Sequence, residues 1–255
     1  MTSPSEVLRI VGHRPWPLPT GPWVMSQVWY DVLFAHWPIS CSVVRPLVPA
    51  GLLLDTFEGE AWVSITPFHM DLRPRAIPVK GSVMHFPELN CRTYVVLGGK
   101  PGIYFFSLDA GSRLAVWGAR MFYRLPYHKA EMRVRKEDGF HYSARRVDGA
   151  ASFEAQYAPL PPIQQALPGS LQHWLTERYC LYTQSGKHIY RGEIHHAPWP
   201  LQEAICEIRQ NSIAAAAGLQ LPETNPLFQF ARQLDVLIWP LHRIKQELGP
   251  LAEST

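Results

Sequence analysis

The chain has few cysteines, and no two of them are spaced like the ligands of a metal finger or a redox pair. Its four cysteines stand far apart, at Cys41, Cys91, Cys180 and Cys206. Zinc fingers and thioredoxin-like sites need closely spaced cysteine pairs, so the sequence argues against both classes. Buried free thiols in a reducing compartment are the simplest interpretation of such a set.

The histidines are numerous but poorly spaced for a metal site. His195 and His196 are adjacent on a predicted strand, so their side chains point to opposite faces of the sheet. His36 and His85 stand alone, and no His-Glu-x-x-His motif is present. We expect no metal and no other cofactor, and we interpret these histidines as structural, with metal binding at any of the four left open.

Long hydrophobic runs are missing as well. No run approaches the roughly 20 apolar residues that span a bilayer, and the longest candidate, 32–54, is interrupted by His36 and Arg45. Residues 1–12 lack the apolar centre of a signal peptide. We therefore expect a cytoplasmic protein with no membrane partner.

Charge of one sign is also scarce. The formal net charge is +3, only 18% of residues are charged, and the basic residues are scattered along the chain. A nucleic-acid binder concentrates them in a stripe or on a helix, so we expect no nucleic-acid partner. The glycine-rich stretch 98–102 lacks the phosphate-loop patterns, and no Gly-x-Ser-x-Gly elbow for a serine nucleophile is found.

What the chain does have is apolar residues and proline. Apolar residues make up 47% of the 255 positions, which excludes intrinsic disorder. The 24 prolines make long helices improbable, because an interior proline removes a hydrogen bond and clashes with the preceding turn. We predict one domain over residues 10–244, with residues 1–9 and 245–255 as flexible termini.

Most of the domain has the pattern of strands. We predict strands over 29–34, 60–70, 91–97, 103–108, 131–136, 140–146, 152–157, 188–196 and 234–238. We predict helices over 43–47, 112–123, 170–178 and 202–217. Helices between strands that do not alternate with them indicate an α+β fold on a mostly antiparallel sheet. Such a sheet is long enough to curl around a cavity.

The most informative stretch runs over residues 86–94. Period-two alternation places Glu88, Asn90, Arg92 and Tyr94 on one face of a strand. Four polar side chains in register are costly beside an apolar strand unless they are paired or hydrated. Two interpretations stay open: a solvent-facing strand with an ion pair between Glu88 and Arg92, or the polar wall of a pocket.

The helix predicted over 112–123 adds two more candidates. Arg113 and Arg120 lie seven residues apart, on one helix face, directly after the predicted hairpin. Arginine is suited to capturing a carboxylate, so both are candidate substrate-binding residues. The alternative is that they are solvated arginines on an amphipathic helix.

Several segments resemble a known bacterial family. These are 14–18 (RPWPL), 33–38 (LFAHWP), 86–94 (FPELNCRTY), 104–110 (YFFSLDA), 125–127 (LPY), 177–182 (ERYCLY) and 195–201 (HHAPWPL). The chain resembles the YqjF-like domain of unknown function, which is placed in the acetoacetate decarboxylase-like superfamily. The resemblance implies a curved, mostly antiparallel sheet that forms a cone or closed barrel around a cavity, with helices packed outside.

The resemblance also implies a chemistry that this chain departs from. Acetoacetate decarboxylases form a Schiff base through a lysine whose pKa is lowered. The matching position near residues 123–125 holds tyrosine, arginine and leucine here, and Lys129 is the only lysine close by. Glu88 resembles an acidic pocket residue of those enzymes.

Two functions remain open from the sequence. One is an enzyme acting on a small organic acid or carbonyl compound without an imine, with Glu88 as general acid or base and with Asn90, Arg92, Tyr94, Arg113 and Arg120 binding the substrate. A nearby Arg92 would lower the pKa of Glu88 and oppose that role. The other is a binding or sensor protein that has lost the catalytic lysine. The expected partner is a small organic ligand, and a homo-oligomer stays open because no residue points to one.

Overall fold

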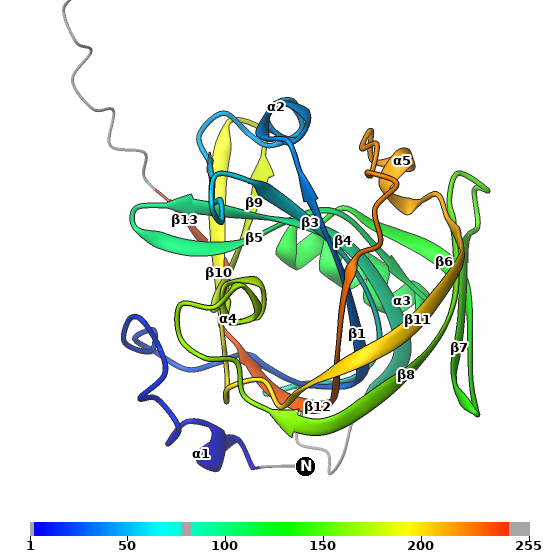
Figure 1. Ribbon diagram of the computed structural model, residues 1–255. Helices are drawn as coiled ribbons and strands as arrows, with labels where there is room; N and C mark the ends of the chain where they lie inside the picture. The colour runs from blue at the N-terminus through cyan, green and yellow to red at the C-terminus, as the bar shows by residue number, and fades with distance from the viewer. Residues whose placement is uncertain (1–2, 78–82, 245–255) are drawn as a thin grey trace, which may run out of the picture.

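The computed structural model describes residues 3–77 and 83–244, and thirteen strands within them form one sheet (Figure 1). The strands are β1 (Met25–Ile39), β2 (Leu53–Leu54), β3 (Ala61–Pro74), β4 (Met84–Leu97), β5 (Lys100–Ala110), β6 (Tyr127–Glu137), β7 (Gly139–Arg146), β8 (Ser152–Gln164), β9 (Cys180–Ser185), β10 (His188–His196), β11 (Leu201–Asn211), β12 (Leu227–Ile238) and β13 (His242–Arg243). The helices are short: α1 (Pro4–Val7), α2 (Cys41–Val44), η1 (Arg45–Leu47), α3 (Arg113–Gly118), η2 (Ala119–Tyr123), α4 (Leu171–Thr176) and α5 (Ile213–Ala216).

Strand pairing closes the sheet on itself twice. One circuit runs through β12, β1, β3, β4, β5, β9 and β10, and a second runs through β12, β1, β3, β4, β5, β6, β7, β8 and β11. The two circuits share β12, β1, β3, β4 and β5, and the strands curve strongly to close them (Figure 1). Only the pairs β5–β6 and β5–β9 are parallel among the described strands. The predicted strand-rich fold with a curved, mostly antiparallel sheet is confirmed.

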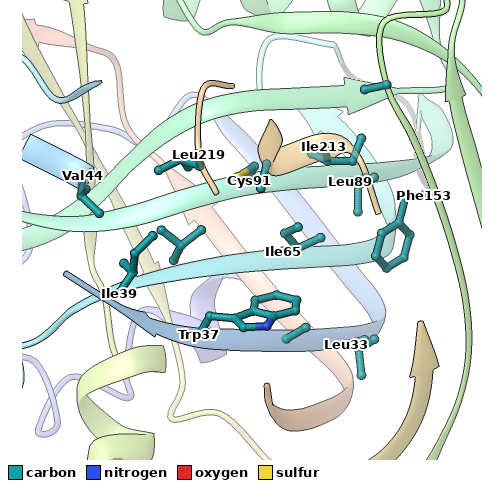
Figure 2. Close-up of a cluster of buried hydrophobic side chains, with 14 of the residues drawn as sticks. Leu33, Trp37, Ile39, Val44, Ile65, Leu89, Cys91, Phe153, Ile213 and Leu219 are labelled. Atoms are coloured by element: carbon teal, nitrogen blue, oxygen red, sulfur yellow. The ribbon is translucent and has the colours of Figure 1, made fainter. Parts of the chain in front are cut away.

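Alternation along the shared strands gives each circuit its own interior. Leu33 and Trp37 of β1, Ile65 of β3, and Leu89 and Cys91 of β4 all lie on one face, in the core that fills the second circuit. Figure 2 shows these side chains together with residues from the α5 region and from β8. The intervening residues of the same strands face the first circuit instead.

A tight turn and a bulge shape the hairpin of β4 and β5. Gly98 and Gly99 join the strands with positive φ values of 60° and 70°, as a two-residue turn of this hand requires. Further along, the pairing shifts at Phe106, so that Phe105 and Leu108 both face the first circuit despite their odd spacing. Both faces of β5 are therefore covered, as its uninterrupted apolar sequence predicts.

The helix predicted over 202–217 is wrong for most of its length. Residues 201–211 form β11, and only Ile213–Ala216 is helical. Ala204, Cys206 and Ile208 alternate with exposed residues along β11, a period of two that outweighs their helix propensity. Strand β9 was not predicted, whereas α3 with η2, and α4, lie within predicted helices.

The N-terminal segment differs from the flexible terminus that we expected. Residues 4–7 form α1, whose first turn is capped by Ser3, and Val7 is buried against Leu237 and Trp239. The ring of His195 also donates a hydrogen bond to the carbonyl of Val7, at 3.0 Å. Val7 and Leu8 therefore anchor this segment to the sheet, whereas residues 245–255 lie outside the described part of the chain. None of the helices described here is long and apolar enough to cross a membrane.

Candidate ligand-binding cavity

A cavity of about 450 Å³ occupies the first strand circuit. Its wall is mainly hydrocarbon, contributed by β1, β3, β4, β5, β9 and β10 and by the helices at its two ends. Cavities of this size enclose ligands well beyond a few atoms, since ligand pockets typically measure about 300–1,000 Å³. The shared strands thus have a solid core behind them and a hollow in front.

Strand β4 runs along the whole cavity. Its alternate residues Arg92, Asn90, Glu88, Phe86 and Met84 all line the wall. Eight residues of extended strand correspond to about 27 Å, so these side chains mark positions from one end of the cavity to the other. Glu88, Asn90 and Arg92 therefore share one face of the strand, as the sequence predicts. That face is the wall of a pocket and is not a solvent-facing surface.

The two ends of the cavity differ in exposure. Where α3 and η2 form the wall, the lining residues Leu114, Trp117 and Phe122 are 73%, 60% and 68% exposed. At the Arg92 end, the lining residues Arg92 and Arg178 are 6% and 3% exposed. The cavity consequently opens beside α3 and is closed around the two arginines.

Arg92 is a buried charge with no carboxylate partner among the described residues. Its guanidinium lies 5.3 Å from the centre of the Phe34 ring, and its Nε has no hydrogen-bond acceptor in the part of the chain that the structure describes. Burial lowers the pKa of the Arg92 guanidinium, and the smaller effect of its interaction with Tyr94 raises that pKa. An uncompensated buried cation is costly, and an anionic ligand would relieve that cost.

A second arginine, Arg178, follows α4 and reaches the same end of the cavity. It forms an ion pair with Asp55 and donates from Nε to the carbonyl of Trp174 at 2.6 Å, whereas its buried Nη2 has no acceptor within residues 3–77 and 83–244. The buried oxygens Thr66 Oγ1 and Asn90 Oδ1 in the same wall also have no hydrogen-bond partner among these residues. Such orphaned polar atoms are rare in folded interiors and point to a bound polar group.

Glu88 lies partway along the cavity, 3% exposed, and accepts a hydrogen bond from the Tyr127 hydroxyl at 2.7 Å. Burial raises the pKa of Glu88 to about 8, with Tyr127 acting in the opposite direction. Arg92 does not counteract this shift, because four residues of extended strand separate the two by about 13 Å. The Glu88 carboxyl is therefore protonated near pH 7 and can act as a proton donor.

Behind Glu88, the neighbouring carboxylate has a different environment. Asp109 is fully buried on the opposite face and is held in a two-pronged ion pair by Arg146, with Nη2 to Oδ2 at 3.1 Å. The Tyr142 hydroxyl donates to the backbone carbonyl of Glu88 at 2.7 Å. These contacts fix the strand from behind while leaving the Glu88 carboxyl facing the cavity.

Tyr94 lies beyond the cavity lining, at its closed end. Its hydroxyl hydrogen-bonds to Ser64 Oγ at 2.7 Å, and Ser64 in turn contacts the ring of His36. Its ring packs 4.7 Å from the Trp174 ring of α4. Tyr94 is thus fully buried and helps to close the cavity floor, where it supports Arg92 and Arg178.

The other sequence candidates lie outside the cavity. Arg113 and Arg120 are both exposed and do not line it, and Arg120 instead donates to the backbone carbonyl of Tyr127 at 2.7 Å. Lys129 does not line the cavity either, and its ammonium donates to the carbonyls of Gly111 and Ala130. Helices α3 and η2 present apolar side chains to the cavity, and Arg113 and Arg120 lie outside it.

The four histidines considered as metal ligands have other partners. His36 contacts Ser64, His85 pairs with Asp71, His195 donates to Val7, and His196 donates to the carbonyl of Ala197 at 2.7 Å. No cluster of three potential ligands occurs among residues 3–77 and 83–244. Burial, followed by the Arg92 charge, keeps the pKa of His36 well below its usual value, so this ring is neutral.

Sequence reasoning missed several lining residues. Arg178, Tyr127, His196 and Trp199 come from segments that precede, follow or end strands, with no local pattern to mark them. All four stand in segments that carry the family resemblance, 125–127, 177–182 and 195–201, which was the available signal. Arg178, His196 and Trp199 reach the cavity only because β9 and β10 close the first circuit.

Comparison with known proteins assigns the family. The family profile of the DUF2071 uncharacterized conserved proteins matches residues 26–235. The chain belongs to this family. It is also 51% identical over 229 residues to the uncharacterized protein YqjF of Bacillus subtilis (strain 168), covering 89% of this chain and 95% of YqjF.

Solved structures of other proteins share the fold of this DUF2071 member. The enduracididine biosynthesis enzyme MppR with bound HEPES superposes with a TM-score of 0.63 at 9% identity, covering 89% of this chain and 90% of MppR. Acetoacetate decarboxylase from Legionella pneumophila gives a TM-score of 0.61 at 13% identity, covering 95% and 96%. At such low identity these matches show the acetoacetate decarboxylase-like fold alone.

Proposed function

We propose that this protein binds an organic acid or carbonyl compound in the cavity and acts on it without a lysine Schiff base. The observation that carries the proposal is Arg92: a buried guanidinium that lines the cavity and has no carboxylate partner in the described chain. A ligand carboxylate would supply the missing charge and accept from Arg92 and from Arg178 Nη2. MppR, a relative in fold, has been captured with pyruvate, a small keto acid.

Glu88 is the group proposed to move a proton. It is held neutral by burial, and the Tyr127 hydroxyl orients one of its oxygens. A carboxylic acid with a pKa near the working pH is an efficient general acid. It would protonate a ligand oxygen or carbon as negative charge develops there, and take the proton back at the end of the cycle.

A lysine is not needed for this chemistry. No lysine is found among the residues described as lining the cavity, and the Lys129 ammonium is occupied by backbone carbonyls. Borohydride reduction in the presence of pyruvate or acetoacetate is therefore expected to leave the protein mass unchanged. A trapped adduct would restore the imine route.

The second candidate function is binding without turnover, as in a sensor. It is favoured by the absence of a suitable base beside Glu88 among the described lining residues: His196 donates to a backbone carbonyl, and burial raises the pKa of the Cys180 thiol to about 11. Either function would operate in the cytoplasm, the compartment that suits four free cysteines.

Thermal shift with a panel of organic acids tests the proposal. An acid present at 100 times its Kd should raise the Tm by about 5–10 °C. Arg92→Met should abolish the shift, whereas Arg113→Ala, which removes an exposed arginine outside the cavity, should retain it. A shift that survives in Arg92→Met, or no shift with any acid, would refute the carboxylate site.

Turnover then separates the two functions. If the protein is an enzyme, Glu88→Gln should lose the reaction and keep the Tm shift. If it is a sensor, neither form consumes the acid that stabilises it.

A further inference from the structure

The cavity carries information about the shape of its ligand, and the inference drawn from it rests on the proposed function. Buried polar atoms that have no hydrogen-bond partner among the described residues are concentrated at one end, on Arg92, Arg178, Thr66 and Asn90. A ligand must place its charged group there, because those atoms have no other partner among the described residues.

From that end toward the mouth, the wall becomes hydrocarbon. Met70 and Leu72 of β3 pair with Phe86 and Met84 of β4, and all four side chains line the cavity. The apolar lining then continues onto α3 and η2, where Leu114, Trp117 and Phe122 remain largely exposed. A short acid held at Arg92 would leave this part of the wall in contact with water only, which is unfavourable for apolar surface.

Volume leads to the same conclusion. The cavity of about 450 Å³ holds about 15 atoms of water size, at roughly 30 Å³ for each. A three-carbon keto acid would occupy a minor part of it. After the carboxylate is placed, the remaining volume accommodates on the order of ten carbons.

We infer that the ligand is an elongated amphiphilic monocarboxylic acid, with its carboxylate between Arg92 and Arg178 and its hydrocarbon chain extending along β4 to the mouth beside α3. Glu88 lies midway along this wall, on the Asn90–Phe86 stretch. The ligand carboxylate would bind at the closed end of the cavity, and contact with the apolar wall would determine which chain lengths bind well.

A homologous series of straight-chain carboxylates tests this inference. Binding of the acids from acetate to dodecanoate is measured by calorimetry on the full chain, below the critical micelle concentration. The affinity should rise about four-fold for each added methylene and level off near ten carbons. The 1-alkanols of matching length should bind at least ten-fold more weakly, and Arg92→Met should remove that difference.

A variant that fills the mouth end tests where the chain lies. Met84→Trp should make the affinity level off at a shorter chain without weakening the shortest acids. Leu53→Trp is the matched control, because Leu53 is 66% exposed on β2 and does not line the cavity. If Met84→Trp does not fold, as judged by circular dichroism, the series on the unmodified protein decides the question alone.

The failures are distinguishable. Arg92-dependent binding of acetate or pyruvate that does not improve with chain length would overturn the amphiphilic ligand and leave the proposed function standing. Absence of Arg92-dependent binding at every length would overturn both. Equal affinity for acids and alkanols would show that the chain binds without a carboxylate anchor, which also refutes both.

Discussion

Two ionisable residues on one strand, Glu88 and Arg92, respond to burial in opposite ways. Arg92 cannot lose its proton in a protein, so burial leaves it as a charge that needs a partner. Glu88 can take up a proton, so burial turns it into a neutral acid. Because the two residues are about 13 Å apart along β4, neither charge offsets the effect of burial on the other side chain.

The raised pKa of Glu88 makes the stability of the ligand-free protein depend on pH. In the folded state Glu88 loses its proton with a pKa of about 8, whereas in the unfolded chain it does so with the ordinary pKa of 4.5. Between these pH values the folded state binds more protons than the unfolded chain. The contribution of Glu88 to the free energy of unfolding is therefore fully present below pH 4.5 and is lost as the pH rises toward 8. The loss should be on the order of a few kcal/mol.

Urea unfolding of the wild type and of Glu88→Gln between pH 5 and pH 8 measures this contribution. The glutamine variant has no proton to lose, so its stability should decline less over the same range. Parallel curves for the two proteins would show that Glu88 is not a protonated acid in the folded state.

At the scale of elements, the contact between β5 and β9 closes the circuit that surrounds the cavity. Only Ile103 with Leu181 and Tyr104 with Tyr182 are paired in it, and the strands run parallel. Gly102 makes the approach possible, because a Cβ there would lie 2.7 Å from the carbonyl oxygen of Cys180. Backbone cannot move away cheaply at that distance, so a single methyl group would separate the two strands.

Gly102→Ala should therefore destabilise the protein by about 1–3 kcal/mol through overpacking. Thermal unfolding measures the change, and ligand affinity should fall with it because Cys180 and Leu181 line the cavity. Gly12→Ala is the control, since a Cβ at Gly12 meets nothing within 4 Å. Equal stability of the two variants would contradict the close approach of β5 and β9.

At the scale of the whole molecule, the two circuits have different interiors: one holds a packed hydrophobic core and the other holds the cavity. The second circuit is filled by side chains such as Phe153, Tyr157 and Phe230, packed against the outer face of the shared strands. The first encloses the cavity. A close-packed interior on one side allows the protein to keep a hollow on the other.

Truncating an aromatic residue should therefore cost more in the second circuit than in the first. Phe153→Ala removes a ring that is 1% exposed in the filled core, with an expected loss of about 3–5 kcal/mol. Phe105→Ala removes a partly buried ring from the cavity wall, with an expected loss of about 1–2 kcal/mol. Denaturant unfolding compares the two, and equal losses would mean that the first circuit is as tightly packed as the second.

Features that depend on neighbours along the chain could be predicted from the sequence. Alternation placed Glu88, Asn90 and Arg92 on one face of β4, the Gly98–Gly99 pair predicted the hairpin, and the apolar run of β5 predicted cover on both faces. These are local consequences of strand geometry and turn conformation, which a single sequence reveals. The same local reasoning failed on residues 202–211, where small and mixed side chains match a helix as well as a strand.

The tertiary structure alone decided what surrounds those residues. Closure of the first circuit brought Arg178 and His196 into the cavity wall that Arg92 also lines, with Arg113 and Arg120 outside it. The pairing of β6 with β5 placed the Tyr127 hydroxyl on Glu88. Each of these contacts joins segments far apart in the chain, so no periodicity records it. Whether a polar residue is a solvated strand face or a pocket wall depends on the strands opposite, and the ionic state of Glu88 follows from that burial.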